Sequence, residues 1–301
     1  MRVIVTGAAG FLGQQVVARL SARHDVVATD IVPCPAPSAI VGDLAEPETL
    51  DRLFATQCDA VIHLATLPGG ACESAPERGW RVNIDATQAL IAASVRHGAR
   101  RFVYASSIAV FGDVAERAQI DDDTPLRPAM LYGGHKAMIE AWLATLGRRG
   151  DLQPLALRLP GLVARPGDGA GLKSAFLSDL FRAARDGQPI RLPVSATATS
   201  WLMSVRCAAE NIVHALERGG QEEPDSAALT LPALRVEMAS LVEALACRTG
   251  RAMPVEYAPD PAIEGAFGSY PPLHTPTADA LGFVHDGDLD RLVANALENL
   301  A

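Results

Sequence analysis

The stretch 3–13, Val-Ile-Val-Thr-Gly-Ala-Ala-Gly-Phe-Leu-Gly, decides the fold of this chain of 301 residues. Its β-branched residues predict a strand, and the residues after Gly13 are apolar at helical spacing, so the glycines lie at a strand-to-helix turn. Such a turn lets the backbone approach a pyrophosphate, whose charge the helix N-terminus meets. The spacing is G-x-x-G-x-x-G rather than G-x-G-x-x-G, so other residues must support a dinucleotide site.

An acidic residue at the end of the next strand gives that support. Asp30 closes the predicted strand 26–30 and follows Gly13 by 17 residues. A carboxylate at this place binds the adenosine ribose and repels a 2′-phosphate, which favours NAD over NADP. The alternative is an aspartate that only ends a strand and begins a turn.

Short apolar runs alternate with amphipathic stretches up to residue 159, the pattern of a parallel sheet with helices on both faces. The predicted strands are 2–6, 26–30, 60–64, 101–106 and 154–159, and the predicted helices are 13–23, 48–55, 76–97 and 131–149. Proline and glycine become frequent afterwards, which indicates a smaller α/β lobe. There we predict helices at 172–186, 205–218, 236–249 and 288–300, and strands at 190–193, 228–231 and 255–257.

The fold class is therefore α/β, a doubly wound parallel sheet of the Rossmann type with a smaller C-terminal substrate lobe. We predict that residues 1–165 form the cofactor domain, with 202–218 returning to it. Residues 166–201 and 219–301 are predicted to form the substrate lobe.

Charge and cysteine usage exclude several classes of protein. The 26 basic and 35 acidic residues give a net charge of −9, which speaks against nucleic acid and anionic lipid as partners. No apolar run of about 18 residues predicts a membrane span. The five cysteines, Cys34, Cys58, Cys72, Cys207 and Cys247, contain no C-x-x-C pair, so we expect free thiols, no metal site and a cytoplasmic protein.

Tyr132 and Lys136 lie four residues apart at the start of a predicted helix and so share one face. A phenol has a pKa of about 10, and a neighbouring cation is needed before it can act as a base near neutral pH. The chain has two lysines and four tyrosines, so one of its two lysines supplies this cation. The alternative for Tyr132 is a half-buried helix aromatic.

Two more polar residues are placed to join this pair. Ser107 follows the predicted strand 101–106, and ligands of open α/β sheets bind beyond the carboxyl ends of strands. Its hydroxyl could polarise a reacting oxygen. Asn83, within the predicted helix 76–97, could hold water or a helix carbonyl, or could simply lie on the helix surface.

Together these residues resemble the extended short-chain dehydrogenase/reductase superfamily, in its NAD-dependent epimerase/dehydratase group. The resemblance implies Tyr132 as acid/base, Lys136 as ligand of the nicotinamide ribose and Ser107 as donor to the substrate oxygen. Asn83 would support a proton relay. The implied NAD site comprises Gly7, Gly10, Phe11, Leu12, Gly13, Asp30, Asp43, Leu44, Leu64, Ala65, Asn83, Ser106, Tyr132, Lys136 and Pro160.

Departures from common members of the family narrow the reaction. Dehydratases carry an acidic pair after the catalytic hydroxyl, whereas Ile108 and Ala109 follow Ser107. Nucleotide-sugar epimerases usually have an asparagine for the diphosphate where this chain has Gly161. Residues 157–167, 201–204 and 257–261 instead resemble the D-erythronate dehydrogenase branch, which implies oxidation of the C2 hydroxyl of a small sugar acid.

A carboxylate substrate favours arginine ligands, and Arg165 and Arg206 are the candidates in the lobe. For each, a surface or structural ion pair is the alternative. Competing functions are a UDP-hexose 4-epimerase of the same fold and a regulator that binds NAD without turnover. The joint presence of Tyr132, Lys136 and Ser107 speaks against the regulator. The resemblance also implies a homodimer joined through helices around 85–97 and 130–146.

Overall fold

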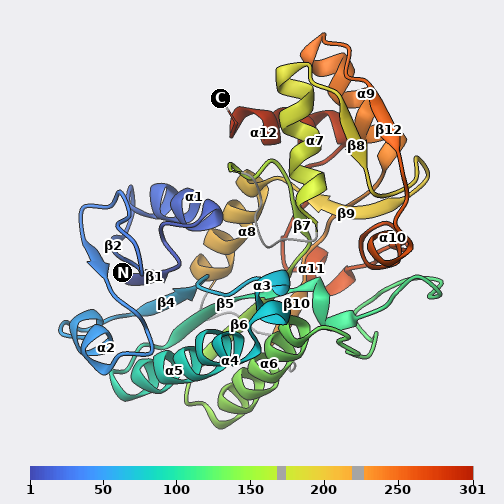
Figure 1. Cartoon of the computed structure of the whole chain (residues 1–301). Helices are drawn as coiled ribbons and strands as arrows, with labels where there is room; N and C mark the ends of the chain where they lie inside the picture. The colour runs from blue at the N-terminus through green and yellow to red at the C-terminus, as the bar shows by residue number, and fades with distance from the viewer. Residues whose placement is uncertain (168–173, 219–226, 301) are drawn as a thin grey trace. The chain divides into compact units, whose positions relative to one another are not determined.

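Seven strands form the main sheet of the computed structural model, which describes residues 1–167, 174–218 and 227–300 (Figure 1). The order is β10-β6-β5-β4-β1-β2-β3. The strands are Arg2–Thr6 (β1), Asp25–Asp30 (β2), Ala39–Val41 (β3), Ala60–His63 (β4), Arg101–Ser107 (β5), Gln153–Leu159 (β6) and Ala228–Thr230 (β10). The pairs β1–β2, β2–β3, β1–β4, β4–β5 and β6–β10 are all parallel, which confirms the predicted doubly wound sheet.

The strand order reverses between β1 and β4, and ligands of such sheets bind beyond the strand ends at this point. Helix α1 (Phe11–Leu20) lies on one side of the sheet, and α5 (Ala86–Arg96) and α6 (Leu131–Arg149) lie on the other (Figure 1). The second of these faces encloses a core of Val61, Phe102, Leu90, Ile139 and Leu143, among others. Helix α2 (Pro47–Leu53) adds Leu50 and Leu53 to it. This core fixes α6, the helix that carries Tyr132 and Lys136.

The predicted helix 76–97 is divided into three parts. Helix α4 (Pro76–Trp80) and helix α5 flank a π-helical turn, η1 (Arg81–Asp85), and the short helix α3 (Gly69–Ser74) precedes them. Such π turns occur frequently at functional sites. The periodicity of the sequence hides the turn because apolar residues continue through it.

The first compact unit contains residues 1–110, 128–158 and 209–230, and the second contains 111–127, 159–208 and 231–301. The predicted strand 228–231 was expected in the substrate lobe, but the structure places β10 in the first unit, as the edge strand beside β6. Strand β10 has only three residues, which are too few for hydrophobic periodicity to indicate the strand with which it pairs. The predicted division also differs from these units at 111–127, 159–165 and 202–208, and its segment 219–226 lies outside the described residues.

The second unit has two small sheets. One joins β7 (Gly161–Leu162), β9 (Thr199–Met203) and β11 (Leu234–Glu237), and the other joins β8 (Ile190–Leu192) and β12 (Val255–Tyr257). Its core is built by α7 (Ala175–Asp186), α9 (Met238–Thr249) and α12 (Leu289–Glu298). The first residues of the predicted helix 172–186 lie outside the described ones. Helix α8 (Val205–Glu217) has residues in both units, and α10 (Pro261–Phe267) and α11 (Pro276–Ala280) complete the chain.

No disulfide joins the five cysteines, all of which lie in the described residues. Among the helices of the described ranges, none is both long enough and apolar enough to cross a lipid bilayer.

Candidate active site

The turn between β1 and α1 is shaped by close backbone packing. Gly7 has a φ of +67°, and a Cβ there would lie 2.6 Å from the backbone nitrogen of Ala65. Gly10 begins α1 without any side-chain cap, and the first turn of α1, starting at Phe11 and Leu12, contains no acidic residue. Its N-terminal N–H groups and positive dipole end therefore fit a pyrophosphate, as the glycine motif predicts.

Asp30 ends β2 as predicted and contacts the same turn. One carboxylate oxygen accepts the backbone N–H of Ala9 at 3.0 Å, and the other accepts the N–H of Ile31 at 2.7 Å. Its carboxylate therefore braces the turn and places a negative charge beside it. This arrangement fits a nicotinamide dinucleotide.

A row of buried hydrogen bonds joins Thr6, His63 and Thr87 at the end of β4. The hydroxyl of Thr6 lies 2.7 Å from Nδ1 of His63, and the hydroxyl of Thr87 lies 2.9 Å from Nε2. The Thr6 hydroxyl also accepts the backbone N–H groups of Leu64 and Ala65 at 3.2 and 3.3 Å. Burial, and to a lesser extent the charge of Lys136, lowers the pKa of His63 to about 3, so the ring is neutral and structural.

The first two turns of α6 bring Tyr132 and Lys136 to the end of β5. A Cβ at Gly133 would lie 2.3 Å from the carbonyl oxygen of Ala109, so glycine permits this close approach. Lys136 is 2% exposed, and its Nζ donates to the carbonyl of Ala105 at 2.7 Å. The same atom lies 5.4 Å from the centre of the Tyr132 ring, which confirms that the two side chains share one face of the helix.

Lys136 lies in a strongly desolvated place. Burial lowers its pKa to about 7, and the charge of Glu140, followed by that of Cys72, acts in the opposite direction. Its ammonium group also lies 4.5 Å from the centre of the Tyr104 ring, within cation–π range. A cation kept this close to a phenol stabilises the phenolate, which is what a tyrosine base requires.

The two serines at the end of β5 have different surroundings. Ser106 is buried, and its hydroxyl donates to the carboxylate of Glu140. Ser107 is half-buried, and its hydroxyl accepts the N–H of Ala109 at 3.2 Å, which leaves its own proton to donate. The predicted role of Ser107 as a donor to the substrate oxygen is compatible with this geometry.

Asn83 is buried in the π-helical turn and holds the segment after β4. Its amide oxygen accepts the N–H of Leu67 at 2.7 Å and the hydroxyl of Thr66 at 3.0 Å. Its amide nitrogen donates to the carbonyl of Leu67 at 3.0 Å and lies 3.1 Å from the sulfur of Cys72. These contacts give Asn83 a structural role, and the proton relay stays a prediction.

The remaining predicted cofactor residues are placed as follows. Asp43 accepts the N–H of Ala45 at 2.9 Å and pairs with Arg81 at 3.2 Å. The side chain of Leu44 belongs to the hydrophobic core, so only its backbone is available to a ligand. Pro160 lies in the second unit.

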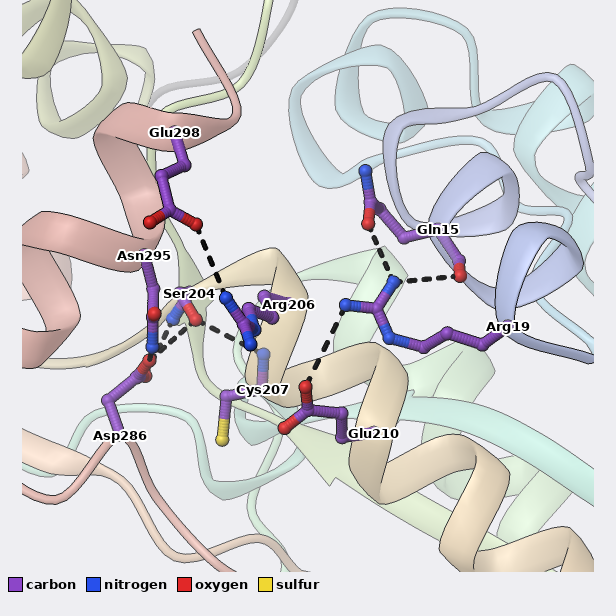
Figure 2. A network of polar contacts seen from close by, with 9 residues as sticks. All are labelled: Gln15, Arg19, Ser204, Arg206, Cys207, Glu210, Asp286, Asn295 and Glu298. Atoms are coloured by element: carbon purple, nitrogen blue, oxygen red, sulfur yellow. Dashed lines mark hydrogen bonds and ion pairs between the residues drawn. The ribbon is translucent and has the colours of Figure 1, made fainter. Parts of the chain in front are cut away.

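The two arginines predicted to bind a carboxylate both have protein partners. Nη1 of Arg206 donates to Glu298 at 3.2 Å, and Figure 2 shows the two side chains directed at each other. Arg165 is half-buried, and its Nε donates to the carbonyl of Leu162 at 3.3 Å. The second unit also contains a cavity of about 440 Å³ lined by Arg117 and Arg235, which the sequence did not point to.

Sequence reasoning missed a buried ion pair whose carboxylate acts on the charge of Lys136. Glu140 and Arg158 are both buried, and their closest contact is 2.8 Å between Nη2 and Oε2. Glu140 follows Tyr132 by eight residues and Lys136 by four, so the same helical spacing that pairs Tyr132 with Lys136 could have indicated it.

Comparison with known proteins shows which family and which proteins this chain resembles. The model of the NAD-dependent epimerase/dehydratase family matches residues 3–226. A D-erythronate dehydrogenase of Cupriavidus necator is 32% identical, with 99% of this chain and 98% of that protein covered. A D-erythronate dehydrogenase of Haemophilus influenzae is 28% identical, with 99% of each chain covered.

A solved structure described as a nucleoside-diphosphate-sugar epimerase of Agrobacterium tumefaciens has the same fold. Its TM-score is 0.86 at 26% identity, and the match covers 99% of this chain and 94% of that one. The relatives reported above include both dehydrogenases and an epimerase. The fold therefore does not decide between these two activities, and the residues of the site must do so.

Proposed function

The chain belongs to the NAD-dependent epimerase/dehydratase family, and on that premise we propose that it oxidises the C2 hydroxyl of a small, D-erythronate-like sugar acid to the 2-oxo acid. The observation that carries the proposal is the buried ammonium of Lys136 beside the ring of Tyr132. The similarity to D-erythronate dehydrogenases over the whole chain supports the substrate class.

The residues of this chain have distinct roles in that reaction. Bound NAD would supply the acceptor for the hydride of C2. Tyr132, as phenolate, takes the proton of the C2 hydroxyl, so that the C–O bond becomes a carbonyl while two electrons leave with the hydride. The charge of Lys136 stabilises the phenolate, and Ser107 donates a hydrogen bond to the reacting oxygen. The net products are the 2-oxo acid, reduced cofactor and one proton.

The chain's own residues also favour NAD over NADP. Asp30 is bonded to the turn that fits the pyrophosphate, so its negative charge lies where a 2′-phosphate would have to be accommodated. A second candidate function is nucleotide-sugar epimerisation, which the similarity to the Agrobacterium tumefaciens epimerase favours.

The test is production of reduced cofactor by the purified protein with NAD and a panel of short sugar acids that includes D-erythronate. We expect turnover of D-erythronate or a close analogue. In Tyr132→Phe it should fall by at least about a hundredfold, the usual contribution of a general base. Tyr257→Phe, a change of a tyrosine in β12, is the matched control and should keep its rate.

If no acid of the panel gives reduced cofactor, this substrate class is rejected. Interconversion of UDP-glucose and UDP-galactose in a separate product assay would then establish the epimerase, because epimerisation produces no net reduced cofactor.

A further inference from the structure

A buried carboxylate continues the catalytic face of α6. Tyr132, Lys136 and Glu140 follow one another at intervals of four residues, so each lies about one turn beyond the last. Glu140 is 3% exposed. Burying a charge without a partner costs much free energy, because the charge loses its hydration. The position of this carboxylate therefore requires an explanation beyond surface charge.

Two partners hold the Glu140 carboxylate. From β6, Arg158 donates through Nε to both carboxylate oxygens, at 3.2 and 3.1 Å, and through Nη2 at 2.8 Å. From β5, the hydroxyl of Ser106 donates to the first of these oxygens. Arg158 is 9% exposed, so water screens this cluster little.

The cluster meets the catalytic residues from two directions. Along β5, Ser106 lies between Ala105, whose carbonyl accepts the Lys136 ammonium, and Ser107, the proposed donor to substrate. Along α6, Glu140 lies one turn from Lys136 and attracts its positive charge. A change at Glu140 is therefore expected to affect the charge of Lys136. It should also affect the end of β5, where the carbonyl of Ala105 accepts the Lys136 ammonium.

We infer that Glu140, held by Arg158 and Ser106, is a positioning residue that keeps Lys136 in its charged form and in place beside Tyr132. The inference rests on the proposed function only in treating Tyr132 and Lys136 as the catalytic pair. Glu140 itself contacts neither of the proposed reacting atoms.

The other groups around Lys136 leave Glu140 as its main source of negative charge. On α6, Tyr132 and Glu140 face it, and His135 is adjacent in sequence. Tyr104 on β5 is fully buried, and burial raises its pKa well above the usual value, so it stays neutral. His63 on β4 is neutral as well, and burial raises the pKa of the Cys72 thiol on α3.

The chain allows a direct test because it has only two lysines, Lys136 and Lys173. In protein labelled with ¹⁵N at the lysine side chains, two amine signals are expected, and Lys173→Arg identifies them. We expect the Lys136 signal to titrate near pH 7 in the unmodified chain. In Glu140→Gln, which keeps the size of the side chain, the midpoint should fall by about one pH unit or more.

Two further variants separate charge from structural damage. Glu140→Asp keeps the carboxylate, so the Lys136 midpoint should stay close to that of the unmodified chain. Arg158→Gln should lower the midpoint, because a buried carboxylate without its charged partner favours the protonated form and then no longer stabilises the Lys136 charge. This variant also keeps the inference testable if Glu140→Gln does not fold. Glu48 is an exposed residue of α2, and Glu48→Gln removes the same charge as Glu140→Gln. This control should leave the Lys136 midpoint unchanged.

The kinetic readout is the pH profile of kcat/KM. In Glu140→Gln the alkaline limb should move to lower pH with the lysine, whereas a purely structural defect would lower the rate at every pH without moving the limb. An unchanged Lys136 midpoint in Glu140→Gln, or in Arg158→Gln, would overturn the inference. The titration needs no substrate, so absence of turnover in the unmodified enzyme would reject the proposed function alone.

Discussion

Asp30 accepts the backbone N–H of Ala9 at 3.0 Å, so the carboxylate that ends β2 is bonded directly to the glycine turn that follows β1. This bond joins two properties in one residue. The carboxylate holds the conformation of the turn, and it places negative charge beside the site that fits the cofactor pyrophosphate. A substitution can separate the two properties if it keeps an acceptor and removes the charge.

Asp30→Asn is such a substitution, because the amide oxygen can still accept the Ala9 N–H. We expect the ratio of kcat/KM with NADP to that with NAD to rise by about tenfold or more, since the repulsion of a 2′-phosphate is removed. Steady-state kinetics with both cofactors measure the ratio. Asp51→Asn, an exposed change in α2, serves as the control, and an unchanged ratio in Asp30→Asn would show that Asp30 only shapes the turn.

His63 should make the fold sensitive to acid. Its pKa is about 3 in the folded protein and 6.5 ordinarily, so between these values the unfolded chain binds a proton that the folded chain does not. The free energy of unfolding must therefore fall as the pH falls through this window. Between about pH 7.5 and 5.5 the contribution is about 1.4 kcal/mol.

Urea unfolding of the unmodified chain and of His63→Gln at the two pH values isolates this contribution from those of other groups. The unmodified chain should lose about 1.4 kcal/mol more than the variant over the interval. Equal losses in the two proteins would mean that the pKa of His63 is the same in the folded and the unfolded chain, so that burial does not lower it.

An apolar face of α6 fits the expected homodimer. Leu131, Met138 and Trp142 are 43%, 46% and 45% exposed, and the last two lie one helical turn apart. Large apolar side chains grouped on a surface are typical of an interface between copies. We expect a dimer by sedimentation and a monomer for Trp142→Glu.

The control for this prediction is Val284→Glu, which places the same charge at another exposed apolar residue, 52% exposed in the second unit. It should remain dimeric. A dimeric Trp142→Glu would place the interface elsewhere.

The two predicted substrate arginines should behave differently. Arg206 and its partner Glu298 are 50% and 63% exposed, and an exposed pair of this kind contributes little. Arg165 is half-buried, so loss of a charge-assisted contact to a carboxylate should cost more there. We expect Arg165→Gln to raise the KM for the sugar acid by about tenfold or more and Arg206→Gln to change it little.

The KM for NAD should stay the same in both variants, which separates substrate binding from damage to the cofactor site. If Arg235→Gln raises the KM for the acid and Arg165→Gln does not, the carboxylate is bound at the cavity lined by Arg117 and Arg235.

The strand–turn–helix at 2–20 and the pairing of Tyr132 with Lys136 could be read from the order of residues. Both depend on contacts between neighbours in sequence, for which glycine spacing and helical periodicity are direct signals. The chain is helical over almost all of the predicted helix 76–97, but periodicity did not show that its middle, Arg81–Asp85, is a π-helical turn. Periodicity describes only which positions are apolar, and the π-helical turn that presents Asn83 to Leu67 leaves that pattern intact.

Contacts between distant segments were decided only by the tertiary structure. The pairing of Glu140 with Arg158 and the place of β10 beside β6 join residues whose neighbours in sequence give no sign of each other. The sequence names the groups that could do the chemistry. Packing decides which of them are desolvated, and around desolvated groups the surrounding charges then set whether the lysine and the tyrosine carry their protons.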